Sequence, residues 1–78
     1  MNLKKVLNKD KTGEKIKSFI RKSSFSYEDI ANELDLSSAR VIYDWMNGFK
    51  MPNIEHLVVL STLLQVQIED ILVIENVF

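Results

Sequence analysis

The 78-residue chain has no cysteine, only two glycines and only one proline. Without cysteine it can form neither a disulfide framework nor a thiolate metal site, so packing must supply its stability. Gly13 and Gly48 lie too far apart to belong to one glycine-rich phosphate-binding loop. The sequence also lacks an apolar run of the roughly 18 residues that a membrane-spanning helix needs. These absences favour a single soluble domain.

Histidine is scarce as well, because His56 is the only one. With no second histidine and no cysteine, the sequence offers neither a set of metal ligands nor a nucleophile–base pair. We therefore expect no metal, no cofactor, no small-molecule ligand and no enzymatic activity. The segment MNLKKVLNKDK lacks the long apolar core and the cleavage site of a signal peptide, so we expect a cytoplasmic protein.

The charges are unevenly distributed along the chain. The net charge is −1, and the 46% hydrophobic and 27% charged residues are typical of a globular fold. Residues 1–22 carry eight basic residues against two acidic ones, whereas residues 23–78 carry only Arg40 and Lys50 against nine acidic ones. This asymmetry indicates a basic segment that meets a polyanion or folds back on the acidic body. Solvated lysines without a partner are the alternative.

Apolar residues recur at intervals of three and four, and no stretch alternates strictly over the length of a strand. Ser26 in SYED begins a near capping box, Ser37 or Ser38 caps the next helix, and Asn53 caps another, whereas Gln67 is a poor cap. Leu3, Val6 and Leu7 are compatible with one amphipathic turn. We therefore predict an all-α fold of five short helices, over about 13–23, 27–34, 38–47, 54–64 and 68–74.

Two of these helices form a helix-turn-helix unit, since only about three residues separate 27–34 from 38–47. Ala31 is small enough to let the two helices approach. The predicted organisation is a basic N-terminal arm over residues 1–12, a helix-turn-helix domain over 13–74 and an apolar C-terminal tail over 75–78.

In this order and spacing, four segments resemble the phage repressor/Cro-type helix-turn-helix family, also called the XRE family. They are GEKIKSFI, FSYEDIANELDLS, VIYDWMNG and MPNIEHLVVLSTLLQVQIEDIL, and the resemblance runs from Gly13 to about Leu72. It implies a compact five-helix fold of the lambda-repressor-like type that binds double-stranded DNA. In such proteins the third helix enters the major groove, and dimers occupy half-sites one helical turn apart.

The resemblance also assigns DNA-binding positions to this chain. Base-reading positions fall on the third helix, Tyr27 contacts phosphate or braces that helix, and Asn47 and Lys50 meet the DNA backbone. The full predicted set is Tyr27, Ser38, Ala39, Arg40, Tyr43, Asp44, Asn47 and Lys50.

The chain departs from the family pattern at several positions. Asp35 stands where the family often has a glycine in the turn, and Asp tolerates the left-handed region better than most residues. One residue more than usual separates Leu36 from Trp45. Ile20 and Met46 replace an Arg and a Glu that bridge two helices in many members, so both ends of an ion pair have become apolar together. We predict that Ile20 and Met46 touch.

Taken alone, the polar positions of helix 38–47 are typical of a solvated face, on which Arg40 and Asp44 at i, i+4 can pair. On a recognition helix, Arg40 can instead donate two hydrogen bonds to guanine, worth roughly 1–3 kcal/mol of discrimination. Asp44 can accept from cytosine N4 or hold Arg40 in one rotamer, and we rank the orienting role first. The face can also have no part in DNA binding.

Cations for the phosphates must come from elsewhere, so we expect Lys4, Lys5, Lys9 and Lys11 to form an arm along the DNA backbone. Trp45 is expected to anchor the core rather than to stack on single strands. The tail residues, Val73, Ile74, Val77 and Phe78, either finish the monomer core or form a two-fold dimer contact.

The predicted function is sequence-specific binding of double-stranded DNA by a small, repressor-like transcriptional regulator that acts as a homodimer. The alternative is a protein-interaction module of the same fold, such as an antitoxin or anti-repressor, that uses its acidic body and apolar tail.

Overall fold

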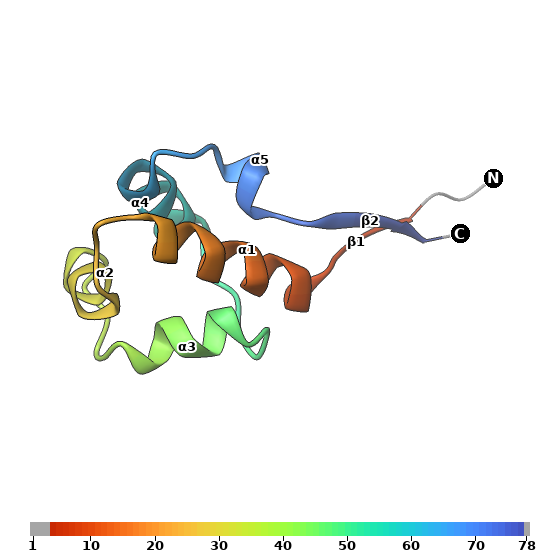
Figure 1. Cartoon of the computed structure of the whole chain (residues 1–78). Coiled ribbons are helices and arrows are strands. Elements are labelled where there is room, and N and C mark those ends of the chain that lie inside the picture. The colour runs from red at the N-terminus through yellow and green to blue at the C-terminus, as the bar shows by residue number, and fades with distance from the viewer. Residues whose placement is uncertain (1–3, 78) are drawn as a thin grey trace.

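The computed structural model describes residues 4–77 and contains five helices and two short strands over that range. Figure 1 shows α1 running through the middle of the molecule, with α3 on one side and α5 on the other. The strands project from the helical body as a ribbon, which makes the molecule elongated, at 45 × 22 × 20 Å. In chain order the elements are β1 Lys4–Leu7, α1 Lys9–Lys22, α2 Tyr27–Glu33, α3 Arg40–Met46, α4 Ile54–Leu64, α5 Ile68–Ile71 and β2 Ile74–Val77.

One apolar core joins all five helices. Trp45 is its largest fully buried side chain, as the sequence predicts, and its ring lies 5.6 Å from that of His56 on α4. Ala31 is buried on α2, where it permits the close packing of α2 on α3. The buried apolar residues are Ile16, Ile20, Ile30, Ala31, Leu34, Ala39, Ile42, Trp45, Met46, Leu57, Leu60, Leu64 and Ile71.

α1 and α3 approach each other most closely at Gly13. A Cβ atom on Gly13 would lie within 2.9 Å of carbonyl atoms of Trp45 and Met46, so only glycine fits there without a backbone shift. Ile20 and Met46 are both buried in the shared core. Met46 adjoins Gly13, which is about two helical turns from Ile20, so the contact between Ile20 and Met46 stays a prediction.

The all-α prediction is wrong in one respect, because β1 and β2 pair in an antiparallel ribbon. The register places Lys4 opposite Val77 and Leu7 opposite Ile74. The predicted amphipathic turn is therefore a strand at Val6 and Leu7, and Leu3 lies outside the described residues. Every residue of both strands is exposed. The strand sequences KKVL and IENV also lack the alternation of apolar and polar residues that marks a half-buried strand.

Three predicted helix boundaries also need correction. α1 begins at Lys9, four residues before the predicted start, because the Asn8 side chain accepts a hydrogen bond from the Lys11 N–H. α3 begins at Arg40 and not at residue 38. Its N-cap is Ala39, which offers no side-chain hydrogen bond, so the predicted cap by Ser37 or Ser38 is wrong. α5 ends at Ile71 and not at residue 74, because the chain turns there into β2.

Two of the predicted caps are confirmed. Ser26 and Asp29 form a full capping box, with reciprocal hydrogen bonds of 3.0 Å. The hydrogen bonds from Ser26 lower the pKa of the Asp29 carboxyl. Asn53 accepts from the His56 N–H at 2.8 Å. At the start of α5, the Asp70 carboxylate inside the helix accepts a hydrogen bond from the N–H of the N-cap residue Gln67.

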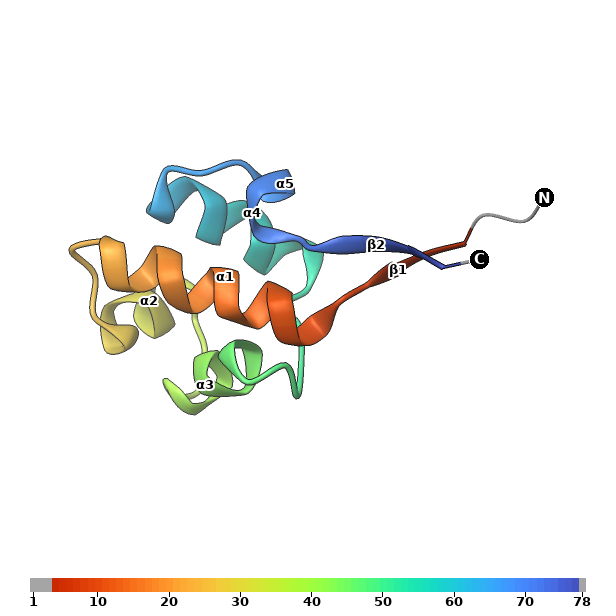
Figure 2. The same ribbon diagram turned by 45° about the vertical axis from the view of Figure 1, so that its right-hand side comes forward.

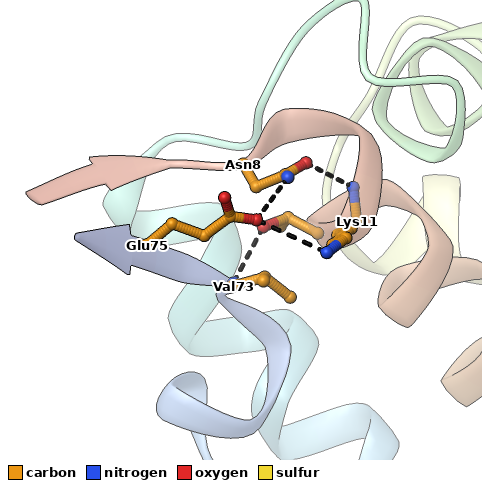
Figure 3. A network of polar contacts seen from close by, with 5 residues as sticks. Asn8, Lys11, Val73 and Glu75 are labelled. Carbon is orange, nitrogen blue, oxygen red and sulfur yellow. Dashed lines mark hydrogen bonds and ion pairs between the residues drawn. The ribbon is translucent and has the colours of Figure 1, made fainter. Parts of the chain in front are cut away.

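A cluster of polar contacts connects the ribbon to α1 (Figure 3). The Asn8 N–H donates to the Val73 carbonyl at 2.8 Å, and the Val73 N–H donates to the fully buried Thr12 hydroxyl at 2.9 Å. The Asn8 amide donates to Glu75 at 2.6 Å, and the Lys11 ammonium lies 3.5 Å from the same carboxylate. The Asn8 hydrogen bond and the Lys11 charge lower the pKa of Glu75. The ribbon is thus attached to the body in a defined direction.

Three helices end in the same backbone motif, with one residue in the left-handed conformation. These residues are Asp35 after α2, Gly48 after α3 and Gln65 after α4, with φ of 54°, 75° and 57°. In each case the next N–H donates to the carbonyl five residues earlier, at 2.9–3.0 Å, which is the Schellman motif. The prediction that Asp35 tolerates the left-handed region is confirmed.

Across residues 4–77, no helix has the length and apolar character that a membrane crossing requires.

Replacing Gly13 with Ala is expected to destabilise the fold by about 2 kcal/mol, because the added methyl group pushes α3 away from α1. Urea unfolding followed by circular dichroism measures the change in the free energy of unfolding. Glu14→Ala, on the exposed side of α1, is the matched control and should leave that free energy nearly unchanged. Equal unfolding midpoints for Gly13→Ala and Glu14→Ala would contradict the close approach.

Gln65→Gly and Asp35→Gly are both expected to stabilise the fold, because glycine adopts positive φ without steric cost. The gain should be about 0.5–1 kcal/mol for Gln65 and smaller for Asp35, since Asp tolerates this conformation better than Gln. Gly48→Ala should act in the opposite direction, because its methyl group would also meet Asp10. Thermal unfolding ranks the three variants. A lower melting temperature for Gln65→Gly would refute the proposed strain.

Candidate nucleic-acid interface

The helix-turn-helix unit consists of α2, a turn over residues 34–39, and α3. Both views show α3 along one side of the molecule, with α1 between it and α5 (Figures 1 and 2). α3 packs on α1 and α2 through one face only. The opposite face of α3 carries the exposed side chains of Arg40 and Tyr43.

The two faces of α3 differ as the sequence predicts. Ile42, Trp45 and Met46 are buried, while Arg40 and Tyr43 are exposed. Asp44 is half-buried. Because buried and exposed positions recur at helical spacing, packing of the apolar face determines the outward direction of the Arg40 guanidinium.

Tyr27 and Tyr43 form an aromatic pair that links α2 to the outer face of α3. Their ring centroids are 5.1 Å apart and the ring planes cross at 66°, an edge-to-face arrangement. Tyr27 is half-buried, whereas Tyr43 is 46% exposed. Tyr27 thus contacts α3 from α2, and its role in DNA binding stays a prediction.

Arg40 and Asp44 do not form the ion pair that their spacing permits. Within residues 4–77, the single ion pair shorter than 4 Å joins Lys11 to Glu75. Arg40 is exposed and unpaired in the free protein. The suggestion that the two side chains pair in solvent is therefore wrong for the free protein.

The structure separates the predicted positions Ser38 and Ala39. Ser38 is exposed, and its hydroxyl accepts a hydrogen bond from the Arg40 N–H at 3.2 Å. Ala39 is only 7% exposed and belongs to the core, so its methyl group faces inward and does not reach a base. The assignment of Ala39 as a base-reading residue is therefore corrected, because its side chain is packed in the core.

Asn47 and Lys50 lie at the C-terminal end of α3, and both are exposed. The Asn47 amide donates to the Tyr43 carbonyl at 2.9 Å, which leaves its amide oxygen free to accept. The Lys50 N–H donates to the Asp44 carbonyl at 3.3 Å, within the motif that ends α3. Gly48 lies against the backbone of Asp10, so this loop is next to the first turn of α1.

The basic residues near the N-terminus do not form a free arm over the described residues. Lys4 and Lys5 belong to the paired strand β1, and Lys9 is the first residue of α1. Lys11 forms the ion pair with Glu75. Among the four lysines of the predicted arm, Lys4, Lys5 and Lys9 are exposed without an acidic partner within 4 Å in the described part of the chain.

Sequence reasoning missed Phe49, which directly follows Gly48 and is 76% exposed. Phe49 was not among the predicted DNA-binding residues. The relevant signal was its place immediately after the recognition helix, next to Lys50.

A family model described as the Cro/C1-type HTH DNA-binding domain matches residues 15–76. This range includes the helix-turn-helix unit and nearly all of β2. The match favours DNA binding over the protein-interaction alternative. Neither the search of curated proteins nor the search of solved structures gave a match. On the evidence of its sequence over residues 15–76 and of the exposed face of α3, the chain belongs to the Cro/C1-type HTH DNA-binding domain family.

Proposed function

We propose that the protein is a small transcriptional regulator of the repressor type that binds a specific sequence in double-stranded DNA. The observation that carries the proposal is the outward face of α3, where Arg40 and Tyr43 are exposed on a helix braced by Tyr27. A helix of this kind fits the major groove, where each base pair presents a distinct pattern of donors and acceptors.

In this proposal Arg40 reads the sequence, because a guanidinium can donate two parallel hydrogen bonds to O6 and N7 of guanine. Ser38 lies two residues before Arg40, is also exposed, and can donate or accept through its hydroxyl. Asp44 accepts from cytosine N4 or holds the Arg40 side chain once DNA is bound. A carboxylate in the groove is repelled by phosphate, so Asp44 favours selectivity at the expense of affinity.

The affinity comes from contacts to the phosphate backbone around α3. The Tyr27–Tyr43 pair lies where the start of α2 meets the middle of α3, and Tyr43 is exposed. At the C-terminal side of α3, Asn47 and Lys50 are exposed in adjoining positions. Lys9 begins α1, whose first turn lies beside Gly48 of this loop. Each cation that neutralises a phosphate releases counterions and makes the binding depend on salt.

We further propose that the protein binds DNA as a homodimer through the ribbon. Ile74 and Val77 are 57% and 44% exposed, so they do not finish the monomer core, and Val73 is half-buried. Phe78, also assigned to the tail, lies outside the described residues. Beside the ribbon is an apolar groove of about 350 Å³, lined by Lys5, Val6, Leu7, Met51, Pro52, Leu57, Leu72 and Ile74. A two-fold contact here would bury this surface and present two recognition helices.

Selection of bound duplexes from a random pool, followed by titration at several salt concentrations, tests the DNA-binding proposal. Arg40→Ala is expected to lose about 10- to 100-fold in discrimination between the selected site and an altered guanine position. Lys50→Ala should weaken binding to all duplexes alike and lower the slope of log K against log salt by about one phosphate contact.

Lys15→Ala is the control for these variants, because it removes one exposed cation from α1. Lys15 lies beside Lys11 and Val73, and not in the loop that follows α3. It should change neither the discrimination nor the slope by more than a small fraction. Failure of the wild-type protein to bind any duplex more tightly than unrelated DNA would disprove the proposed sequence specificity.

Val77→Lys is expected to dissociate the proposed homodimer, because it places a like charge in each half of a two-fold contact. Val77 is exposed in the free chain, so the helical body should remain folded. Sedimentation equilibrium measures the dissociation constant, with Val59→Lys on α4, itself 38% exposed, as the control. An unchanged dissociation constant for Val77→Lys, or a wild-type protein that stays monomeric at high concentration, would exclude the ribbon as the interface.

A further inference from the structure

Phe49 occupies the same position in its Schellman motif as Leu36 and Val66 do in theirs. Each of the three residues donates its N–H to the carbonyl five residues earlier, at 2.9–3.0 Å. In such motifs the residue at this position usually makes a hydrophobic contact with the helix that it ends. Leu36 and Val66 pack against the core, whereas Phe49 is 76% exposed. The largest of the three side chains is thus the one left in solvent.

The backbone under Phe49 is held from two directions. The Asp44 carbonyl accepts from the N–H groups of both Phe49 and Lys50, at 2.9 and 3.3 Å. On the other side, Gly48 rests against the backbone of Asp10 in α1. The backbone that carries the ring is therefore held in place directly beyond the C-terminal end of α3.

The surroundings of Phe49 match a sugar–phosphate backbone. Asn47 and Lys50 flank it, and both are exposed. Residues 45–54 contain no acidic side chain, in a part of the chain that is otherwise acidic. A cation and an amide bind phosphate oxygens, while an apolar ring fits the carbon face of a deoxyribose between two phosphates.

The position along α3 favours the sugar over the bases. The N-terminal residues of a recognition helix meet the base edges, so its C-terminal end lies near the rim of the groove, where a DNA strand passes. We propose that Phe49 packs on a deoxyribose of the bound duplex and, with Lys50, forms a contact that strengthens binding to every DNA sequence. This inference rests on the proposed placement of α3 in the major groove.

A second copy of the chain is the competing occupant of this residue. Three exposed apolar residues of the ribbon, Val6, Leu7 and Ile74, line the groove that a second copy would cover, and Met51 and Pro52 form part of the same lining. Phe49 does not line that groove. Continuity with α3 and the neighbouring cation therefore favour DNA as its partner.

Phe49→Ala tests the contact with the deoxyribose. Its expected effects on affinity, on discrimination between sequences and on salt dependence differ from those of replacing a charged or a base-reading residue. Binding to the selected duplex and to unrelated duplexes should weaken alike, by about 5- to 10-fold, because burial of part of the ring is lost in both complexes. The slope of log K against log salt should stay unchanged, since no counterion release depends on a neutral ring. Phe49→Leu should recover part of the affinity. Val59→Ala is the control and should change nothing.

Two further measurements separate the possible partners of the ring. Replacing thymine by uracil throughout the duplex removes the base methyl groups but keeps every deoxyribose, so the loss caused by Phe49→Ala should persist. Its disappearance in uracil DNA would assign the ring to a base and overturn the sugar contact. A weaker dimer for Phe49→Ala, with unchanged affinity of the dimer for DNA, would assign it to the second copy and also overturn it. If the wild-type protein binds no duplex, the proposed DNA-binding function itself is contradicted, rather than the contact of Phe49.

Discussion

The approach of α1 to α3 at Gly13 is the contact on which the arrangement of the whole domain depends. At this position the backbone of one helix touches the carbonyl groups that end the other, and no side chain separates them. The approach brings Trp45 and Met46 into the core and sets how α3 rests on α1. The loop that follows α3 is fixed in the same way, because Gly48 meets Asp10 one turn earlier on α1. Both glycines of the chain therefore serve one helix pair.

The exposed face of α3 is a consequence of this packing. A helix of seven residues has little stability of its own, and the burial of Ile42, Trp45 and Met46 holds it in place. Arg40 and Tyr43 lie on the other side of the helix and point outward, so the core rather than interactions of their own presents them. The Tyr27–Tyr43 pair adds a second attachment from α2. A rigid surface of this kind limits the entropy that is lost when a ligand binds.

Local sequence patterns predicted most of the helical body and failed where long-range contacts decide. The capping residues Ser26 and Asn53 were recognisable because the groups that they satisfy lie within three residues. Ala39 was misplaced because the periodicity of α3 does not reveal where its first turn begins. The pairing of Lys4 with Val77 could not be predicted, because its partners are separated by nearly the whole chain and their side chains show no alternation.

The ribbon also implies an order of events during folding. Its strands flank the helices in the sequence, so their pairing closes a loop that contains the entire helical body. Closing a loop of this length costs conformational entropy, and contacts that form earlier within the loop reduce that cost. α1 and α5 supply such contacts, because they pack on each other and the Val73 N–H at the start of the ribbon donates to Thr12 in α1. The strands should therefore join last, and on a ribosome they stay apart until β2 has emerged.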